Sequence, residues 1–202
     1  MPNTASPAVA STVGLKNVVI APVVSDTDAG VSYGTLQDFA GAIDAQISPE
    51  NAEPDVQHAD DVEFAVVFPD PEVKLTMEMA DIPLLIQELI LSNVIDDNGV
   101  LIRAAGDTPG YFALGFKSEK ADGTYRFVWL FKGRAAPMTE QYHTKEGTTL
   151  TRQTGKLEWT FIKRTFDKRY QAIADEGQNG FTPEKAATFL TSVYTPVVTS
   201  GT

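Results

Sequence analysis

EVKLTMEM, residues 72–79, alternates polar and apolar side chains without a break. Successive side chains of a β-strand point to opposite faces of a sheet, so this stretch predicts a strand with one buried face and one polar face. A continuous apolar run at 17–24 contains Pro22, which suits an edge strand or a strand that bends there. Together with further alternating segments, these stretches predict seven or eight strands. The further segments are 38–48, 62–68, 111–117 and 156–161.

The segment TYRFVWLFK, residues 124–132, differs from the other predicted strands. It follows a predicted hairpin turn at 121–123, and aromatic side chains occupy alternate positions on one of its faces. Val128 and Leu130 make the middle of the other face apolar as well. Such a strand is either central and covered on both faces, or its second face contacts another subunit. On the second interpretation, Val128 and Leu130 are candidate interface residues.

Two segments have the spacing of a helix. Asp81 can cap a helix that has Pro83 in its first turn, with apolar residues at 82, 85, 86, 89 and 90. Thr182 and Pro183 begin the second, with apolar residues at 186, 189, 190 and 193. Many strands and few helices predict a mainly β fold, an antiparallel sandwich or barrel with a flanking α-helix and a short C-terminal helix.

A chain of 202 residues has the length of one domain, which we expect to span residues 14–194. Residues 1–13 and 195–202 are rich in small residues and proline and lack apolar periodicity, so they predict a flexible N-terminal arm and a C-terminal tail. No stretch has the ~18 consecutive apolar residues of a membrane span, and the N-terminus lacks the pattern of a signal peptide. We expect a protein made in the cytoplasm, without membrane contact.

The charge of the chain is unevenly distributed. Its 16 basic and 27 acidic residues give a net charge of −11. Residues 1–101 hold 17 acidic and two basic residues, whereas residues 102–202 hold 10 acidic and 14 basic ones. The overall acidity disfavours sequence-specific DNA binding, because it repels phosphate. Either the two halves form differently charged faces of one domain, or their opposite charges favour head-to-tail contacts between copies.

Residues that support catalysis or metal binding are sparse. The chain has no cysteine, and His58 and His143 lack the spacing that places two metal ligands on one helix face. The Asp-rich run at 26–30 does not continue into a calcium-binding loop, because Val31 and Gln37 stand where such a loop needs glycine and glutamate. We therefore expect no enzyme activity, no cofactor and no metal site.

A basic cluster with interleaved aromatic residues lies at 161–170. It contains Lys163, Arg164, Lys168 and Arg169. Such a cluster can bind single-stranded nucleic acid through charge and stacking, and a strand end followed by a solvated loop has the same composition. We favour a third interpretation, contact with an acidic neighbouring subunit, which makes Lys163 and Arg164 candidate interface residues.

Short motifs along most of the chain have a familiar order and spacing. They are GLKNV at 14–18, YGT at 33–35, GAI at 41–43, ADD at 59–61, DNGVLI at 97–102, GRA at 133–135 after the aromatic strand, and FLTSVY at 189–194. In this order they resemble the major tail proteins of long, flexible-tailed bacteriophages, specifically the phi13-type family. The N-terminal arm and residues 177–180 have no counterpart among these motifs.

The resemblance implies a structural protein of the virion tail, with no catalytic residues. Its β-sandwich or barrel subunits would form hexameric rings that stack into the tube through which phage DNA leaves. The implied partners are further copies of the chain, a tape measure protein, and tail terminator and tail tip proteins. DNA would pass through the tube without specific binding.

Two sets of acidic residues fit this expectation. The polar segment 48–61 predicts a loop that bridges successive rings, since its prolines at 49 and 54 oppose a regular strand. The acidic residues of this loop are Glu50, Glu53, Asp55, Asp60 and Asp61. A negative channel wall would repel DNA phosphate, and its candidates come from the polar faces of strands in the first half of the chain. These are Asp38, Asp44, Glu63, Glu72 and Glu78.

A ligand-binding or carbohydrate-binding β-sandwich module is the alternative. Such a module would expose a planar aromatic platform, whereas Trp129 and Trp159 fall on the apolar faces of their predicted strands. An enzyme acting on a sugar would need paired carboxylates such as Asp60 and Asp61. With 27 acidic residues in the chain, adjacent pairs are expected by chance.

Overall fold

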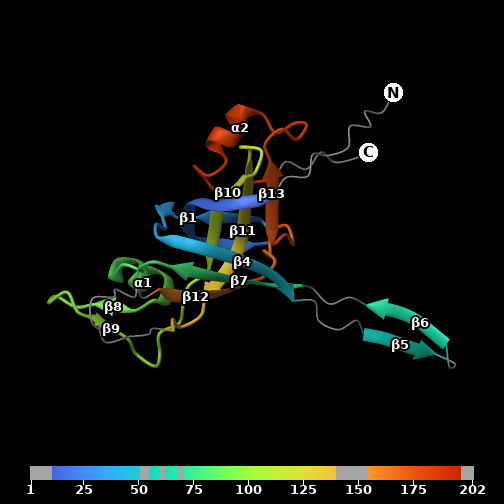
Figure 1. Cartoon of the computed structure of the whole chain (residues 1–202). Coiled ribbons are helices and arrows are strands. Elements are labelled where there is room, and N and C mark those ends of the chain that lie inside the picture. Colours follow the sequence, from blue (N-terminus) through green and yellow to red (C-terminus); the bar gives the residue numbers. More distant parts are fainter. Residues whose placement is uncertain (1–10, 51–54, 60–61, 68–70, 140–153, 197–202) are drawn as a thin grey trace, which may run out of the picture.

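The computed structural model describes residues 11–50, 55–59, 62–67, 71–139 and 154–196, with the backbone alone for 55–59 and 62–67 (Figure 1). Thirteen strands and two helices lie in these ranges, more strands than the periodicity of the sequence predicts. The elements are β1 (Thr12–Thr27), β2 (Gly30–Tyr33), β3 (Gln37–Asp38), β4 (Ala42–Glu50), β5 (Asp55–Ala59), β6 (Val62–Val67), β7 (Glu72–Met79), α1 (Leu84–Leu91), β8 (Val94–Ile95), β9 (Leu101–Ile102), β10 (Phe112–Lys120), β11 (Tyr125–Ala135), β12 (Gly155–Phe161), β13 (Gln171–Asp175) and α2 (Pro183–Thr188).

Nine of the strands form one antiparallel sheet that folds over into a sandwich. Its order is β2-β1-β10-β11-β12-β7-β4, with β13 also beside β11 and β3 beside β1. The strand β11 joins the two halves, because residues 126–130 pair with β13 and residues 133–135 pair with β12. The β10–β11 register shifts between these two segments, and such a bulge allows a strand to bend. The prediction of a mainly β, antiparallel fold with few helices is confirmed.

The strand β7 lies between β4 and β12 and has the two faces that its sequence predicts. Val73, Leu75, Met77 and Met79 are fully buried, and the intervening side chains are exposed or half-buried. Burial of each large apolar side chain stabilises the fold by roughly 1.5–3 kcal/mol. On β12 the same alternation buries Trp159, which is 1% exposed.

Both faces of β11 are covered within a single chain. One face packs beneath α2, where the indole N–H of Trp129 donates a hydrogen bond to the carbonyl of Phe189 at 2.9 Å. On the other face, Val128 and Leu130 lie in the core between the two halves of the sheet and are 4% and 0% exposed. The interpretation of this segment as a central strand is therefore correct. The prediction that Val128 and Leu130 contact another subunit is wrong, because the chain itself covers them.

The two helices lie where the sequence predicts them, but the buried face of α1 differs. Asp81 accepts a hydrogen bond from the N–H of Ile82 at 2.8 Å, and the helix itself begins only at Leu84. Leu85, part of the predicted apolar stripe, is 70% exposed, whereas Gln87 is buried and its side-chain amide donates a hydrogen bond to the carbonyl of Ile82 at 2.9 Å. The buried residues of α1 are Gln87, Ile90 and Leu91. The helix α2 begins at Pro183, as predicted.

The predicted strand at 38–48 is interrupted. Gly41, with a φ of +94°, separates β3 from β4 in a conformation that favours glycine. The register of β4 against β7 then shifts between Ala42 and Asp44. This bulge leaves Ile43, predicted to be buried, 51% exposed.

The predicted polar loop at 48–61 is largely strand, so the loop prediction is corrected. The strand β4 continues to Glu50, with Pro49 opposite Val73, and β5 pairs with β6 in an antiparallel hairpin. Pro49 is tolerated because β4 lies at the edge of the sheet, where a missing N–H breaks no second ladder. Figure 1 shows the β5–β6 hairpin standing clear of the sandwich.

Candidate functional surfaces

The outward side chains of β4, β7 and β12 form a continuous polar surface, which we call the acidic strand face. The strand register aligns Asp44 with Glu78 and Lys156, and Gln46 with Thr76 and Glu158. The face holds five carboxylates and two lysines. Its charged members are Asp44, Glu50, Glu72, Lys74, Glu78, Lys156 and Glu158.

Only part of the negative charge on the acidic strand face is balanced by its own lysines. Lys74 pairs with Glu50 at 2.7 Å, and this contact raises the pKa of Lys74. Lys156 pairs with Glu158 at 3.2 Å. Both pairs are solvent-exposed, so they contribute little to stability. The face also contains a hollow of about 610 Å³ whose lining residues, among them Asp44 and Glu78, are all polar or charged.

The structure brings three of the five predicted channel residues together on this face, namely Asp44, Glu72 and Glu78. Asp38 lies apart, on β3 opposite Val19 of β1. The side chain of Glu63 is outside the described residues. Glu158 joins the face although the sequence-based set omits it, because that set was restricted to the first half of the chain and β12 comes from the second half.

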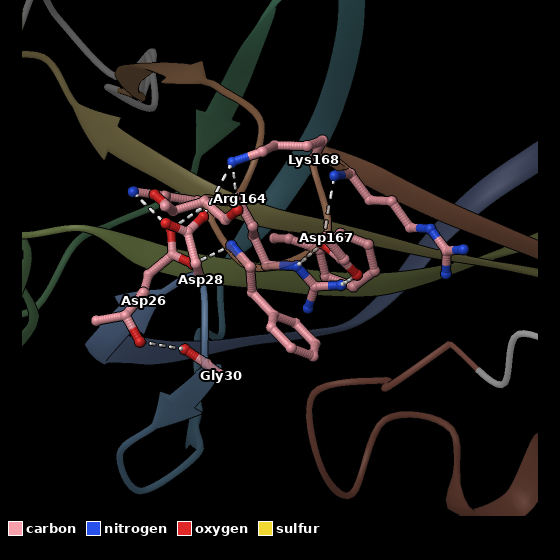
Figure 2. Close-up of polar contacts among 12 residues, drawn as sticks. Asp26, Asp28, Gly30, Arg164, Asp167 and Lys168 are labelled. Atoms are coloured by element: carbon pink, nitrogen blue, oxygen red, sulfur yellow. Dashed lines mark hydrogen bonds and ion pairs between the residues drawn. The ribbon is translucent and has the colours of Figure 1, made fainter.

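A second surface is the connection between β12 and β13, residues 162–170, which we call the 162–170 loop. Figure 2 shows Asp26 beneath it, with its carboxylate directed at the loop. Asp26 accepts hydrogen bonds from the N–H groups of Thr165 and Phe166 at 2.7 and 3.0 Å, and pairs with Lys132 at 2.7 Å. Burial acts to raise the pKa of Asp26, but these donors outweigh it and lower the pKa to about 2. Asp26 therefore holds the loop to the β1–β2 hairpin as a buried carboxylate.

Arg164 is a second anchor of this loop. It is 1% exposed, and its guanidinium donates two hydrogen bonds to Asp167 and a third to the hydroxyl of Tyr33. The same guanidinium lies over the ring of Phe131, 3.8 Å from the ring centre. The prediction that Arg164 meets a neighbouring subunit is wrong, because its charge is used inside the chain. Lys163, the other predicted interface cation, is exposed.

The remaining predicted positions lie on or near the β5–β6 hairpin. Glu50 is on the acidic strand face, and Asp55 begins β5. Glu53, Asp60 and Asp61 fall outside the described residues. Residues 51–67 contain five acidic residues and no lysine or arginine.

The described residues offer little for other kinds of function. None of them form a group of three or more His, Cys, Asp or Glu side chains that could hold a metal ion. No helix in the described part of the chain is long and apolar enough to cross a membrane. Trp129 and Trp159 are 0% and 1% exposed, so neither supplies an aromatic platform at the surface.

Comparison with known proteins gives no match: no protein-family model matches the sequence, and no curated protein does.

Proposed function

We propose that this protein is the major subunit of a bacteriophage tail tube. Its copies form hexameric rings, and the rings stack around a channel through which DNA leaves the virion. The acidic strand face lines this channel. Further copies, a tape measure protein, and tail terminator and tail tip proteins are its partners, and DNA passes without specific binding.

The acidic strand face is the observation that supports this proposal most strongly. Its carboxylates outnumber its lysines and are exposed, although the apolar side chains on the reverse side of β7 and β12 are fully buried. A wall of this charge repels phosphate within a Debye length of about 8 Å at physiological salt. The buried apolar side chains of β7 and β12 keep the wall in one shape. Both properties suit a channel that DNA traverses without adhering.

The β5–β6 hairpin is consistent with assembly. It extends from the edge of the acidic strand face, between β4 and β7, and stands clear of the sandwich (Figure 1). An isolated two-stranded hairpin is marginally stable in water, so a neighbouring subunit that packs against it would stabilise it. The hairpin would thus link copies to one another, within a ring or between successive rings.

A carbohydrate-binding module is less well supported. Sugar rings bind well to exposed planar aromatic side chains, but both tryptophans of this chain lie in the core. The exposed aromatic side chains among the described residues are Phe166 and Tyr194, at 40% and 36%, and the ring of Tyr194 packs against that of Phe189.

Self-assembly is the first property to measure. Light scattering across a concentration series gives the mass of the particles, and negative-stain electron microscopy of the same samples gives their form. We expect particles far heavier than the 21.9 kDa subunit, seen as rings or as tubes with a central channel. A 21.9 kDa monomer at every concentration, without rings or tubes, would contradict the proposal.

A further inference from the structure

The 162–170 loop presents a positive surface on a negatively charged protein. The loop has four basic residues and one acidic residue, whereas the whole chain has a net charge of −11. Arg164 and Asp167 neutralise each other inside the protein, which leaves Lys163, Lys168 and Arg169. Lys168 also makes a long ion pair with the exposed Asp28, at 3.4 Å. Lys163, Phe166 and Lys168 are exposed on it, so cationic groups flank an aromatic ring that is 40% accessible.

The backbone of this loop is already fixed in the isolated subunit. The hydrogen bonds that Thr165 and Phe166 donate to Asp26, and the ion pair of Arg164 with Asp167, fix the loop to the strands beneath it. Two backbone hydrogen bonds also close it, from the N–H of Arg164 to the carbonyl of Arg169 at 2.9 Å and from the N–H of Lys168 to the carbonyl of Arg164 at 3.1 Å. A pre-organised surface loses little conformational entropy when a partner binds. The loop is therefore a suitable receptor.

The β5–β6 hairpin has complementary chemistry. Residues 51–67 include five acidic residues and no lysine or arginine. Its sequence also offers apolar residues at 62, 64 and 66, in a strand whose pairing with β5 shifts register between residues 63 and 65. A neighbour of this hairpin should thus carry positive charge beside an exposed apolar group.

We infer that the 162–170 loop of each copy binds the acidic β5–β6 hairpin of another copy of the chain. The carboxylates of the hairpin meet Lys163 and Lys168, and its apolar residues meet Phe166. Each copy gives its hairpin to one neighbour and receives a hairpin from another, which is the heterologous contact that produces rings or filaments. This inference rests on the proposed self-assembly and names the surfaces that make it.

The connectivity of the sheet favours a hairpin from a different copy. Val73 of β7 pairs with Phe161 of β12, so the hairpin leaves the sandwich at the end where the 162–170 loop begins. The hairpin then extends away from the sandwich (Figure 1). A second copy placed beside the first, in the same orientation, would therefore bring its own 162–170 loop next to the extended hairpin.

Paired charge reversals test this contact in the full-length protein. The loop variant carries Lys163→Glu and Lys168→Glu. The hairpin variant carries Asp55→Lys and Glu63→Lys, which lie in β5 and β6 and leave residues 60–61 unchanged. A control carries Lys16→Glu and Lys185→Glu, which are exposed lysines outside both the loop and the acidic strand face, with the same change in net charge as the loop variant. Circular dichroism confirms that each variant is folded.

We expect the loop variant and the hairpin variant each to raise the concentration needed for assembly about tenfold, equivalent to about 1.4 kcal/mol. The control assembles as the wild type does. An equimolar mixture of the two variants assembles again, because every hairpin then finds a loop of opposite charge on an alternating neighbour. A single chain with all four reversals also assembles.

Other outcomes overturn the inference in distinguishable ways. If the chain with all four reversals assembles again but the mixture of the two variants does not, the hairpin binds the loop of its own chain. If the wild type and all variants assemble alike, the surfaces are wrong although the proposed function stands. If assembly is unchanged and only the loop variant loses binding to single-stranded DNA, the loop is a nucleic-acid site. If the wild type never assembles, the proposed function fails as well.

Discussion

At the scale of single residues, Asp26 fixes the 162–170 loop to the rest of the fold. Its side chain is 4% exposed and its carboxylate joins β1 to a loop that follows it by about 140 residues. Removal of one partner from a buried charge pair is strongly destabilising, because the other charge is left buried and unpaired. Here that charge is Lys132, whose side chain is 13% exposed.

Asp26→Asn should lower the free energy of unfolding by about 3 kcal/mol, through the loss of the pair with Lys132 and of charge-assisted bonds from the loop. Urea denaturation measures this change. Asp28→Asn is the matched control, because Asp28 is 88% exposed and its ion pair with Lys168 is long, at 3.4 Å. We expect the control to change stability by less than about 0.5 kcal/mol. Equal effects of the two substitutions would refute the role assigned to Asp26.

The pH dependence of stability should reflect the same carboxylate. Asp26 has a pKa of about 2 in the folded protein against an ordinary value of 3.8, so its contribution is fully present above pH ~4 and is lost as the pH falls through ~2. That contribution is about 2 kcal/mol. Asp175, which accepts hydrogen bonds from Arg126 and Lys120, has a pKa lowered to about 2 and acts in the same range. Urea midpoints between pH 5 and pH 2.5 should fall less steeply in Asp26→Asn than in the wild type; parallel curves would contradict this.

At the scale of elements, the β5–β6 hairpin should be separable from the fold. Glu50 of β4 lies opposite Glu72 of β7 in the strand register, so the two strands on either side of the hairpin are already adjacent and antiparallel. Replacement of residues 51–71 by Asn-Gly gives a two-residue connection of the kind that joins such strands. We expect thermal unfolding within a few degrees of the wild type, because the buried core that the structure describes lies outside residues 51–71, and no tubes by electron microscopy. Tubes of normal length from this variant would show that the hairpin has no part in assembly.

Strands with strict alternation were predictable from sequence, because every second side chain of β7 and β12 must be buried. The position of α1 was predictable, but its buried face was not, since that face includes the polar Gln87, whose amide bonds the carbonyl of Ile82 and the guanidinium of Arg103. The last residues of β4 were missed because Pro49 was taken to oppose a regular strand, whereas an edge strand accommodates proline. The bulge that exposes Ile43 leaves no signal in the sequence.

At the scale of the whole molecule, the acidic half of the chain does not form one surface. The acidic strand face combines β4 and β7 with β12 from the second half, and Asp38 lies elsewhere. Sequence could suggest which carboxylates are polar-face residues, as for Asp44, Glu72 and Glu78. It could not show that Arg164 is buried, because its burial depends on contacts with Phe131 and with Tyr33, which is more than a hundred residues away.

The charge of the acidic strand face should decide how the assembled protein treats DNA. Wild-type assemblies should bind DNA no more tightly as salt is lowered, because repulsion then extends further. Reversal of Asp44, Glu72 and Glu78 to lysine should create DNA binding that weakens as salt is raised, measured by fluorescence titration. The control reverses Asp38, Asp97 and Glu184, which are exposed outside this face and outside the 162–170 loop. Equal DNA binding by both variants would mean that net charge, not this face, governs the effect.

The central claim is that the β4–β7–β12 face lines the channel of a tube. Electron cryomicroscopy of particles assembled from the purified chain tests it most directly. We expect stacked six-fold rings in which Asp44, Glu72 and Glu78 of every copy point into a central channel, with the sandwich core and α2 outside it. Rings with this face turned outward, or buried between subunits, would contradict the account, as would a chain that remains monomeric under all conditions.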